Sequence, residues 1–515
     1  MTSDTSIRSV AAGMKGPLAR GALAVLATAQ LVLALDYSIV NVALLSIGES
    51  LGFSGDGVEW IVSAYALVFG GFLLLGGRAA DLLGRRRMFM ASAALFGVAS
   101  TIGGFSTTPA MLLASRALQG LAAGFLFPAT LSLVNTSFPE GPSRNLAVSV
   151  WGAAGASGLA FGVIVGGVLT TGLGWRWVFF VNVPVLGLVL AAAPLVLPAS
   201  RPSRPSLGDF DIPGAATATA GMLLVVLSLV QLPMRGWESP ATLLPAALGL
   251  GLLVAFLAIE HRSRTPLMPL SLFRRRTLAT GMVVTAAFMA SFGMQFFFLT
   301  LYLQSALHMS PLVAGLHFLP LAAFIVVGNA IGGRLATRFG AAHVLPWGLA
   351  IGATGVLAYT QLGASDTLSV LVLGEMIAGF GQGMTFTTAY LVAGSGVEAE
   401  RQGIASGMAS TAQQVGGSIG LALLVDLLSS KLQSRDPLGM VLDGTTVSAL
   451  VPALKSVFVA QAAVALAAAL LVALVTRRSP ALRVRRSSSH QQSGPRFPET
   501  ILQPNAAPCP RAPDR

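Results

Sequence analysis

Residues 77–87 read GRAADLLGRRR, and residues 333–340 read GRLATRFG. Each stretch directly follows a long apolar segment, and the two begin 256 positions apart. Two further pairs have nearly the same spacing. RNLA at 144–147 matches RQGIA at 401–405 with an offset of 257, and the run at 116–124 matches 375–383 with an offset of 259. Three nearly equal offsets indicate that the chain contains two homologous halves.

Lipid is the only solvent that suits the composition. The 515 residues are 54% hydrophobic and 10% charged, with a mean hydropathy of +0.76, whereas a soluble domain carries roughly 25% charged residues. Long unbroken apolar runs exclude the alternating pattern of a membrane β-barrel, so we expect an all-α polytopic membrane protein. Fourteen segments are long enough to span, at 21–45, 58–77, 88–106, 110–134, 147–172, 177–199, 212–233, 241–260, 278–303, 312–333, 343–362, 368–393, 404–428 and 452–476.

The positive charges lie mainly between alternate spans. With a cytoplasmic N-terminus, the inside segments hold 23 Lys and Arg residues and the outside loops hold five. The positive-inside rule therefore predicts a multi-pass protein of the inner or plasma membrane with both termini in the cytoplasm. We expect residues 1–20 to form a cytoplasmic N-terminus without a cleaved signal peptide. The polar residues 477–515 should form a disordered cytoplasmic tail.

The repeat also predicts the domain organisation. An offset near 257 exceeds the length of six spans and their loops by about two helices. We therefore expect an N-terminal six-helix bundle at 21–199, a linker with two accessory spans at 200–276, and a C-terminal six-helix bundle at 277–476.

Several classes of function are disfavoured by the sequence. The net charge of +12 comes from short clusters between apolar runs, which is a topology signal, so we expect no nucleic-acid partner. Cys509 is the only cysteine, and no group of His, Cys or acidic residues has the spacing of a metal site or a catalytic triad. We therefore expect no cofactor, no metal and no enzymatic activity.

Five motifs in order link the chain to a known family. LDYSIVNVAL occupies 35–44, the loop at 77–87 is close to Gly-x-Leu-Ala-Asp-x-x-Gly-Arg-Lys, Arg116 begins a fourth-span motif, the fifth span has a glycine series, and WRWVFFVNVP follows at 175–184. In these motifs the chain resembles the major facilitator superfamily, and within it the fourteen-span drug:proton antiporters of the EmrB/QacA type. The resemblance covers roughly residues 20–476. It departs at Leu45 and Val163, where the family usually has proline.

This resemblance implies a major facilitator fold, with two six-helix bundles plus two inserted helices. In that architecture the two halves rock to expose a midplane site alternately to each side of the membrane.

Four charged residues within spans are candidates for proton coupling. A carboxylate inside an apolar span, as at Asp36, costs roughly 2.5–3.5 kcal/mol. Because burial disfavours the charged form, proton occupancy there can change as water gains access. The resemblance implies that Arg116, which keeps its own proton, tunes a nearby acidic site. Glu375 occupies the matching place in the second half, and Asp426 lies near the outer end of the thirteenth span. Static polar contacts that specify helix packing are the alternative.

Two polar faces are candidates for substrate binding. One lies on the first span, with Asp36 at its edge. Gln119, one turn beyond Arg116 in the fourth span, is a further candidate. The other face follows i, i+4, i+7, i+11 along the ninth span. Aromatic and amide groups on one face can bind planar or cationic organic molecules, although helix packing would also explain them. The eight residues are Gln30, Tyr37, Asn41, Gln119, Ser291, Gln295, Phe298 and Tyr302.

The loop after the second span is a candidate gate. Its glycines permit tight turns and its aspartate can accept N–H bonds from a helix start. The resemblance implies that this loop clamps the cytoplasmic side of the outward-open state. The second copy has Thr337 in place of the aspartate, so we expect unequal clamps. The gate residues are Gly77, Asp81, Gly84, Arg85 and Arg86.

Glycines recur every four residues on the fifth span. Gly158, Gly162 and Gly166, with Gly167 beside them, give a groove for close helix contact. We expect helix packing to be their main role.

The predicted function follows from the energy source. No ATP-binding loop is present, so pumping must use an ion gradient. One charge across 100 mV and one pH unit together supply about 3.7 kcal/mol, which sustains a gradient on the order of several hundredfold. We predict a proton-coupled antiporter that exports lipophilic or cationic drugs or antibiotics by alternating access. We expect a monomer whose partners are a small-molecule substrate, protons and the lipid bilayer.

Three alternatives remain open at this stage. One is a specific exporter of an endogenous metabolite, and another is a proton-coupled importer. The third is a membrane sensor or scaffold without turnover.

Overall fold

The regular secondary structure of the described chain is helical. The computed structural model describes residues 16–53, 57–58, 60–199, 211–236, 238–263, 266, 268–363, 368–432 and 447–478. The first half consists of α2 (Pro17–Leu51), α3 (Trp60–Leu83), α4 (Arg85–Gly104), α5 (Pro109–Ser137), α6 (Pro142–Gly172), α7 (Trp177–Phe180) and α8 (Asn182–Val196). The accessory pair is α9 (Ile212–Arg235) and α10 (Pro240–Arg262). The second half consists of α11 (Arg276–Ser291), α12 (Gln295–Leu301), α13 (Pro311–His317), α14 (Leu319–Phe339), α15 (Ala341–Ala358), α16 (Leu368–Gly394), α17 (Gln402–Leu432) and α19 (Val447–Arg478).

These helices occupy the expected spans. Thirteen helices of the described chain are long and apolar enough to cross a membrane. The remaining expected segment, 88–106, is occupied by α4, whose 20 residues begin with three arginines. The predictions for residues 1–15 and for the tail beyond residue 478 lie outside the described residues.

The repeat seen in the sequence is present in the backbone. Gly84, with φ 97° and ψ 122°, separates α3 from α4. Gly340, with φ 87° and ψ 137°, separates α14 from α15. A non-glycine residue is rarely found at positive φ. The two copies of the loop motif therefore make the same turn, and in each copy the motif's last glycine supplies it.

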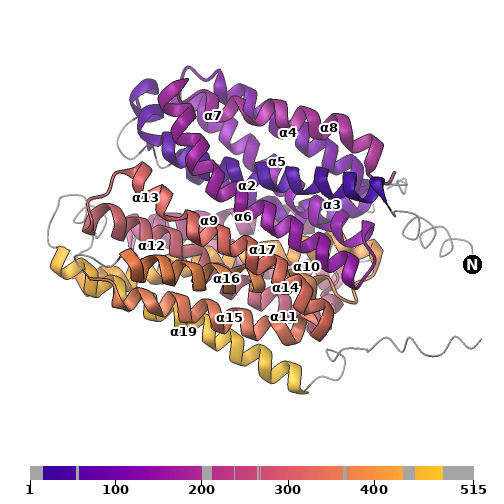
Figure 1. Cartoon of the computed structure of the whole chain (residues 1–515). Coiled ribbons are helices and arrows are strands. Elements are labelled where there is room, and N and C mark those ends of the chain that lie inside the picture. Colours follow the sequence, from indigo (N-terminus) through magenta and orange to yellow (C-terminus); the bar gives the residue numbers. More distant parts are fainter. Residues whose placement is uncertain are drawn as a thin grey trace, which may run out of the picture. The chain divides into compact units, whose positions relative to one another are not determined.

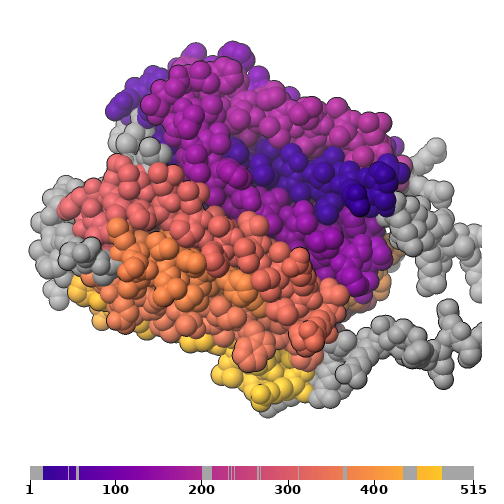
Figure 2. Space-filling model, in the orientation of Figure 1, coloured from indigo at the N-terminus to yellow at the C-terminus, as the bar shows by residue number. Residues whose placement is uncertain are grey.

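Each half contributes its own core. One large cluster of buried apolar side chains comes mainly from α2–α8, with additions from α16 and α17. Another comes mainly from α11–α19. The long helices run alongside one another (Figure 1), and the colours of the two halves separate on the visible face (Figure 2). The additions from α16 and α17 mean that the halves share part of the first cluster.

The accessory helix α9 contacts α3 of the first half and α17 of the second, whereas α10 packs mainly on α9. A notch at Gly70 and Gly71 on α3 receives α9. A Cβ at Gly71 would lie 2.6 Å from Leu223, and one at Gly70 would lie 3.5 Å from Val226 and 3.0 Å from Gln414. The accessory pair therefore lies across the line along which the two halves meet.

Helix α6 packs closely on α2 through its glycines. A Cβ at Gly158 would lie 2.4 Å from the carbonyl oxygen of Leu31, and one at Gly166 would lie 2.9 Å from that of Ile39. Gly167, by contrast, is only half-buried. Because helices in lipid associate through close packing rather than a hydrophobic drive, these contacts hold the first span in place.

We expect Gly162→Ala to destabilise the protein by about 1–3 kcal/mol, the usual cost of overpacking. Its added Cβ would lie 1.9 Å from the hydroxyl oxygen of Ser38 and 2.8 Å from the carbonyl oxygen of Leu35. Thermal unfolding of the purified protein measures the effect. Gly172→Ala on the same helix is the matched control, because its Cβ would have no neighbour within 4 Å. Equal melting temperatures for the two variants would contradict the packing role.

The expected ninth span is broken. A 3₁₀ turn at Phe292–Met294 separates α11 from α12, and a π-helical turn follows at Tyr302–Ala306. The predicted span at 278–303 is confirmed, since a candidate membrane helix covers Arg276–Ala306, but a uniform 100° step per residue does not hold across these turns.

Candidate functional site

A buried ion pair lies inside the first half. The Arg116 side chain on α5 donates from Nη1 to Asp36 Oδ2 on α2 at 2.7 Å. The two side chains are 1% and 0% exposed. Each charge in such a pair needs the other, because removing one partner leaves an uncompensated buried charge.

Two amides complete the surroundings of the carboxylate. Gln119 Nε2 donates to Asp36 Oδ1 at 3.0 Å, and Asn182 Nδ2 donates to the same oxygen at 2.8 Å. The hydroxyl oxygen of Ser100 accepts from Gln119 Nε2 at 2.8 Å. Helices α2, α4, α5 and α8 thus converge on one carboxylate, whose two oxygens accept three hydrogen bonds.

The guanidinium has partners besides Asp36. Arg116 Nη1 also donates to Gln119 Oε1 at 2.8 Å, and Nε donates to the carbonyl oxygen of Ile61 on α3 at 3.0 Å. Its Cζ lies 4.5 Å from the centre of the Tyr65 ring, a cation–π distance. Arg116 therefore has favourable contacts that do not depend on Asp36.

Three members of this site were not predicted. Ser100 and Tyr65 had no predicted role, and Asn182 was identified only as part of the WRWVFFVNVP motif. That motif was the available signal, since a buried amide in an apolar run implies a polar partner.

The other first-span candidates differ from the carboxylate in their surroundings. Tyr37 is 42% exposed and Asn41 is also exposed, whereas Asp36 is fully buried. Gln30 is buried, and its Nε2 lies 3.0 Å from where a Cβ at Gly155 would be. The expected stripe with Asp36 at its edge is therefore split, because the carboxylate turns into the bundle. Gln119, which was expected to contact substrate, is instead bonded to Asp36.

A second polar cluster occupies the second half. Glu375 on α16 is fully buried, and within the described residues neither carboxyl oxygen has a hydrogen-bond partner. Close by, Gln295 Nε2 donates to the Tyr359 hydroxyl at 2.6 Å, and Gln382 Nε2 donates to Gln295 Oε1 at 2.7 Å. The two halves thus differ, since the carboxyl at Asp36 has an arginine and that at Glu375 has none.

The remaining ninth-span candidates are buried in the second half. The Ser291 hydroxyl donates to the carbonyl oxygen of Gln461 at 2.7 Å, and the Tyr302 hydroxyl to that of Gly363 at 2.8 Å. Phe298 belongs to the core cluster of this half. Asp426 is exposed on α17. The structure does not bring these four residues together with Asp36.

The predicted gate loop joins the halves. Asp81 Oδ1 and Oδ2 accept from the backbone N–H groups of Gly403 and Ile404, each at 2.9 Å, at the start of α17. Arg85 donates to Asp81 Oδ1 at 2.6 Å and to the carbonyl oxygen of Ala399. A helix N-terminus favours an anion, so Asp81 is placed to hold α3 against α17.

The other gate residues pack around this contact. A Cβ at Gly77 would lie 2.3 Å from the carbonyl oxygen of Gly403, so α3 and α17 touch through their backbones. Arg86 donates to the carbonyl oxygen of Leu197 at 3.0 Å. In the second copy, Thr337 lies 2.9 Å from the Asn145 amide. The two copies therefore make unequal contacts, an anion on a helix start in one and a neutral pair in the other.

We expect Asp81→Ala to weaken the contact between α3 and α17 by roughly 1.5–3 kcal/mol, the usual worth of hydrogen bonds to a charged group. The probe is a cysteine at Ser406, which is buried on α17 within one turn of the contact, near Leu131 and Asn135 of α5, in a Cys509→Ser background. Its labelling by a maleimide should increase about tenfold or more.

Glu140→Ala is the matched control for the gate. Glu140 also bridges the halves, accepting from the Gly396 N–H at 3.2 Å, but its side chain is exposed. Its loss should change labelling little. Equal labelling in both variants would contradict a clamp at Asp81.

Long apolar helices packed around buried polar clusters define a polytopic membrane protein. The family model described as Major Facilitator Superfamily matches residues 26–421. The chain belongs to this superfamily and is a multi-pass membrane protein.

Similar proteins support the assignment. The puromycin resistance protein pur8 of Streptomyces alboniger is 38% identical over 408 residues, which cover 78% of this chain and 80% of that protein. The cephamycin export protein CmcT of Amycolatopsis lactamdurans is 37% identical over 433 residues, covering 84% and 89%. The crystal structure of the human organic anion transporter MFSD10 (TETRAN) matches with a TM-score of 0.63 at 18% identity, covering 89% of this chain and 100% of that one. That match shows the shared fold.

Proposed function

We propose that this protein is a proton-coupled antiporter that exports lipophilic or cationic drugs or antibiotics by alternating access. The observation that carries the proposal is the fully buried carboxylate of Asp36, paired with Arg116 at 2.7 Å inside a bundle of membrane-spanning helices. Relatives named for antibiotic resistance or export support the direction of transport and the kind of substrate.

The geometry gives the proton a defined effect. While Asp36 is charged, it and Arg116 form a neutral pair. A proton on Asp36 leaves the guanidinium charge uncompensated, although Gln119 Oε1 and the Ile61 carbonyl remain as acceptors. A net positive charge in a low-dielectric interior is costly. Proton uptake is therefore favoured when the site is open to water, and it opposes the simultaneous presence of a cationic substrate.

Other assignments belong to the same proposal. The bundles at 21–199 and 277–476 rock against each other, and both termini face the cytoplasm. The protein works as a monomer. Glu375 and Asp426 are further proton-binding candidates. The complete burial of Glu375 supports this assignment.

The exposed first-span residues are proposed as part of the substrate path. Tyr37 and Asn41 are accessible on α2, and Tyr37 adjoins Tyr65, with ring centres 6.4 Å apart. The Tyr65 ring thus lies between a molecule beside Tyr37 and the Arg116 guanidinium.

Transport by proteoliposomes under an imposed pH gradient tests this function. We expect export of several unrelated lipophilic cations, with proton release from loaded vesicles when substrate is added. Movement of one compound alone would favour a specialist exporter of an endogenous metabolite. Solute flux that is indifferent to the pH gradient would refute proton coupling, and no flux of any compound would favour a sensor or scaffold.

A further inference from the structure

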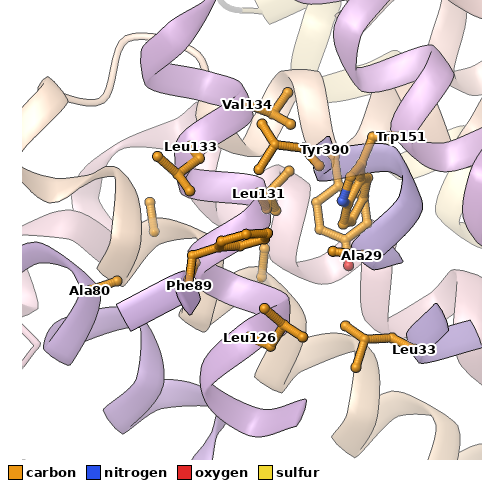
Figure 3. Packing of buried hydrophobic residues seen from close by; sticks show 14 of the residues in the cluster. Ala29, Leu33, Ala80, Phe89, Leu126, Leu131, Leu133, Val134, Trp151 and Tyr390 are labelled. Atoms are coloured by element: carbon orange, nitrogen blue, oxygen red, sulfur yellow. The ribbon is translucent and has the colours of Figure 1, made fainter. Parts of the chain in front are cut away.

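A group of aromatic rings crosses from the first half to the second. The Trp151 ring on α6 lies 5.3 Å from that of Phe127 on α5, 5.8 Å from Phe386 and 5.5 Å from Tyr390, both on α16. Phe386 and Tyr390 are themselves 4.9 Å apart. Figure 3 shows the Trp151 and Tyr390 rings side by side. We call Phe127, Trp151, Phe386 and Tyr390 the aromatic box.

The box is connected by rings to the buried ion pair. Phe127 lies 6.0 Å from Phe69, which lies 5.9 Å from Tyr65, and Tyr65 is the ring beneath the Arg116 guanidinium. A molecule held at the box would therefore adjoin the side chains that surround Asp36 without touching that carboxylate itself.

A glycine makes room for the box. A Cβ at Gly152 on α6 would lie 2.9 Å from Phe386 and 2.7 Å from the amide oxygen of Asn329 on α14. Any larger residue would push α16 away from Trp151. The absence of a side chain at Gly152 thus allows rings of the two halves to come into contact.

The box also contains an unsatisfied donor. Trp151 is 0% exposed, and within the described residues its Nε1 has no hydrogen-bond partner. A buried tryptophan N–H usually finds an acceptor. The Tyr390 hydroxyl, by contrast, donates to Gln413 Oε1. A bound molecule that carries an acceptor would satisfy the Trp151 N–H.

We propose that the aromatic box is the site that receives the planar aromatic part of the exported substrate. The inference rests on the proposed export function. Trp151 and Phe386 come from opposite halves and their planes differ by only 23°. At 5.8 Å between centres they are already in ring contact, so a third ring enters only when the halves separate. Binding and separation of the halves are thereby linked.

The lining fixes the chemical class of the ligand. The four box side chains carry no charge, so the box selects rings rather than ionic groups. The ligand should be a flat, fused aromatic molecule with a carbonyl or similar acceptor for Trp151 Nε1. A bulky cation whose rings are not coplanar should bind elsewhere or less tightly.

Equilibrium binding of daunorubicin to the purified full-length protein tests the box. Daunorubicin has fused planar rings with carbonyl acceptors, and tetraphenylphosphonium is the non-planar comparison. Trp151→Leu and Phe386→Leu should each weaken daunorubicin binding roughly tenfold or more, from the usual worth of aromatic stacking. Tetraphenylphosphonium binding should change little. Trp151→Phe, which keeps a ring, should lose much less.

Phe105→Leu is the matched control for the box. Phe105 also forms an aromatic pair, with Phe180 at 5.0 Å, but it is 65% exposed and lies outside the box. Daunorubicin affinity should be unchanged in this variant, and melting temperatures show that each variant folds.

The outcomes separate the box from the antiport function. Unchanged daunorubicin affinity in both leucine variants, or no daunorubicin binding by the parent protein, overturns the box. Tight, box-dependent binding without proton-driven flux of any compound would overturn the antiport function and leave the box as a binding site.

Discussion

Proteoliposomes that contain Asp36→Asn are expected to lose proton-driven accumulation of substrate. Asparagine keeps the size of the side chain and an oxygen for Arg116, but it cannot take up a proton. The accumulation ratio should fall from on the order of several hundredfold, the limit set by about 3.7 kcal/mol of proton-motive force, to about one. Substrate concentrations on both sides of the vesicle, measured with and without a pH gradient, give the result.

Downhill exchange distinguishes lost coupling from lost folding. Asp36→Asn should still exchange labelled for unlabelled substrate, since exchange needs no proton. Glu49→Gln is the matched control, because Glu49 lies on the same helix α2 and is exposed. Its coupling should equal that of the parent. Retained accumulation in Asp36→Asn would mean that the coupling proton binds elsewhere, with Glu375 as the next candidate.

The second large effect is expected for Arg116→Leu. This change leaves the carboxylate of Asp36 buried without its cation, and it also removes the donors to Gln119 Oε1 and the Ile61 carbonyl. Breaking a buried pair by removing one partner typically costs about 3–5 kcal/mol. The yield of folded protein and its melting temperature should both fall sharply.

A double mutant identifies the cause of that loss. Adding Asp36→Asn to Arg116→Leu removes the stranded charge and should recover a large part of the stability. Arg176→Leu is the matched single control, because Arg176 also donates to a carbonyl, that of Ser106 at 3.2 Å, and also covers a ring, that of Trp175 at 4.4 Å. Among the residues that the structure describes, Arg176 pairs with no carboxylate, so its loss should be small. An equally unstable double mutant would show that Arg116 acts through packing alone.

Most of the fold could be predicted because hydropathy and the repeat are properties of local sequence. The spans follow from apolar length, and the turns at Gly84 and Gly340 follow from a motif that occurs twice. The break at Phe292–Met294 could not be predicted, since a 3₁₀ turn in an apolar run leaves no mark in hydropathy. The four residues of the predicted face, Ser291, Gln295, Phe298 and Tyr302, are nevertheless all buried in the second half.

The site was only half predictable. Asp36 and Arg116 stand out because charges are rare in spans. Periodicity places side chains around one helix, but it does not say which face meets another helix. Asp36, placed by periodicity at the edge of the face of Tyr37 and Asn41, is therefore buried while those two residues are exposed. Asn182, 146 residues along the chain from Asp36, joins the carboxylate only through tertiary packing.

The notch at Gly70 and Gly71 decides which half carries the accessory pair. Leu223 of α9 sits against bare backbone of α3, and α9 makes more extensive contact with α3 than with α17. We therefore expect α9 and α10 to move with the first half when the halves rock. The insertion would thus enlarge the first half and contact α17 of the second, without adding a third moving unit.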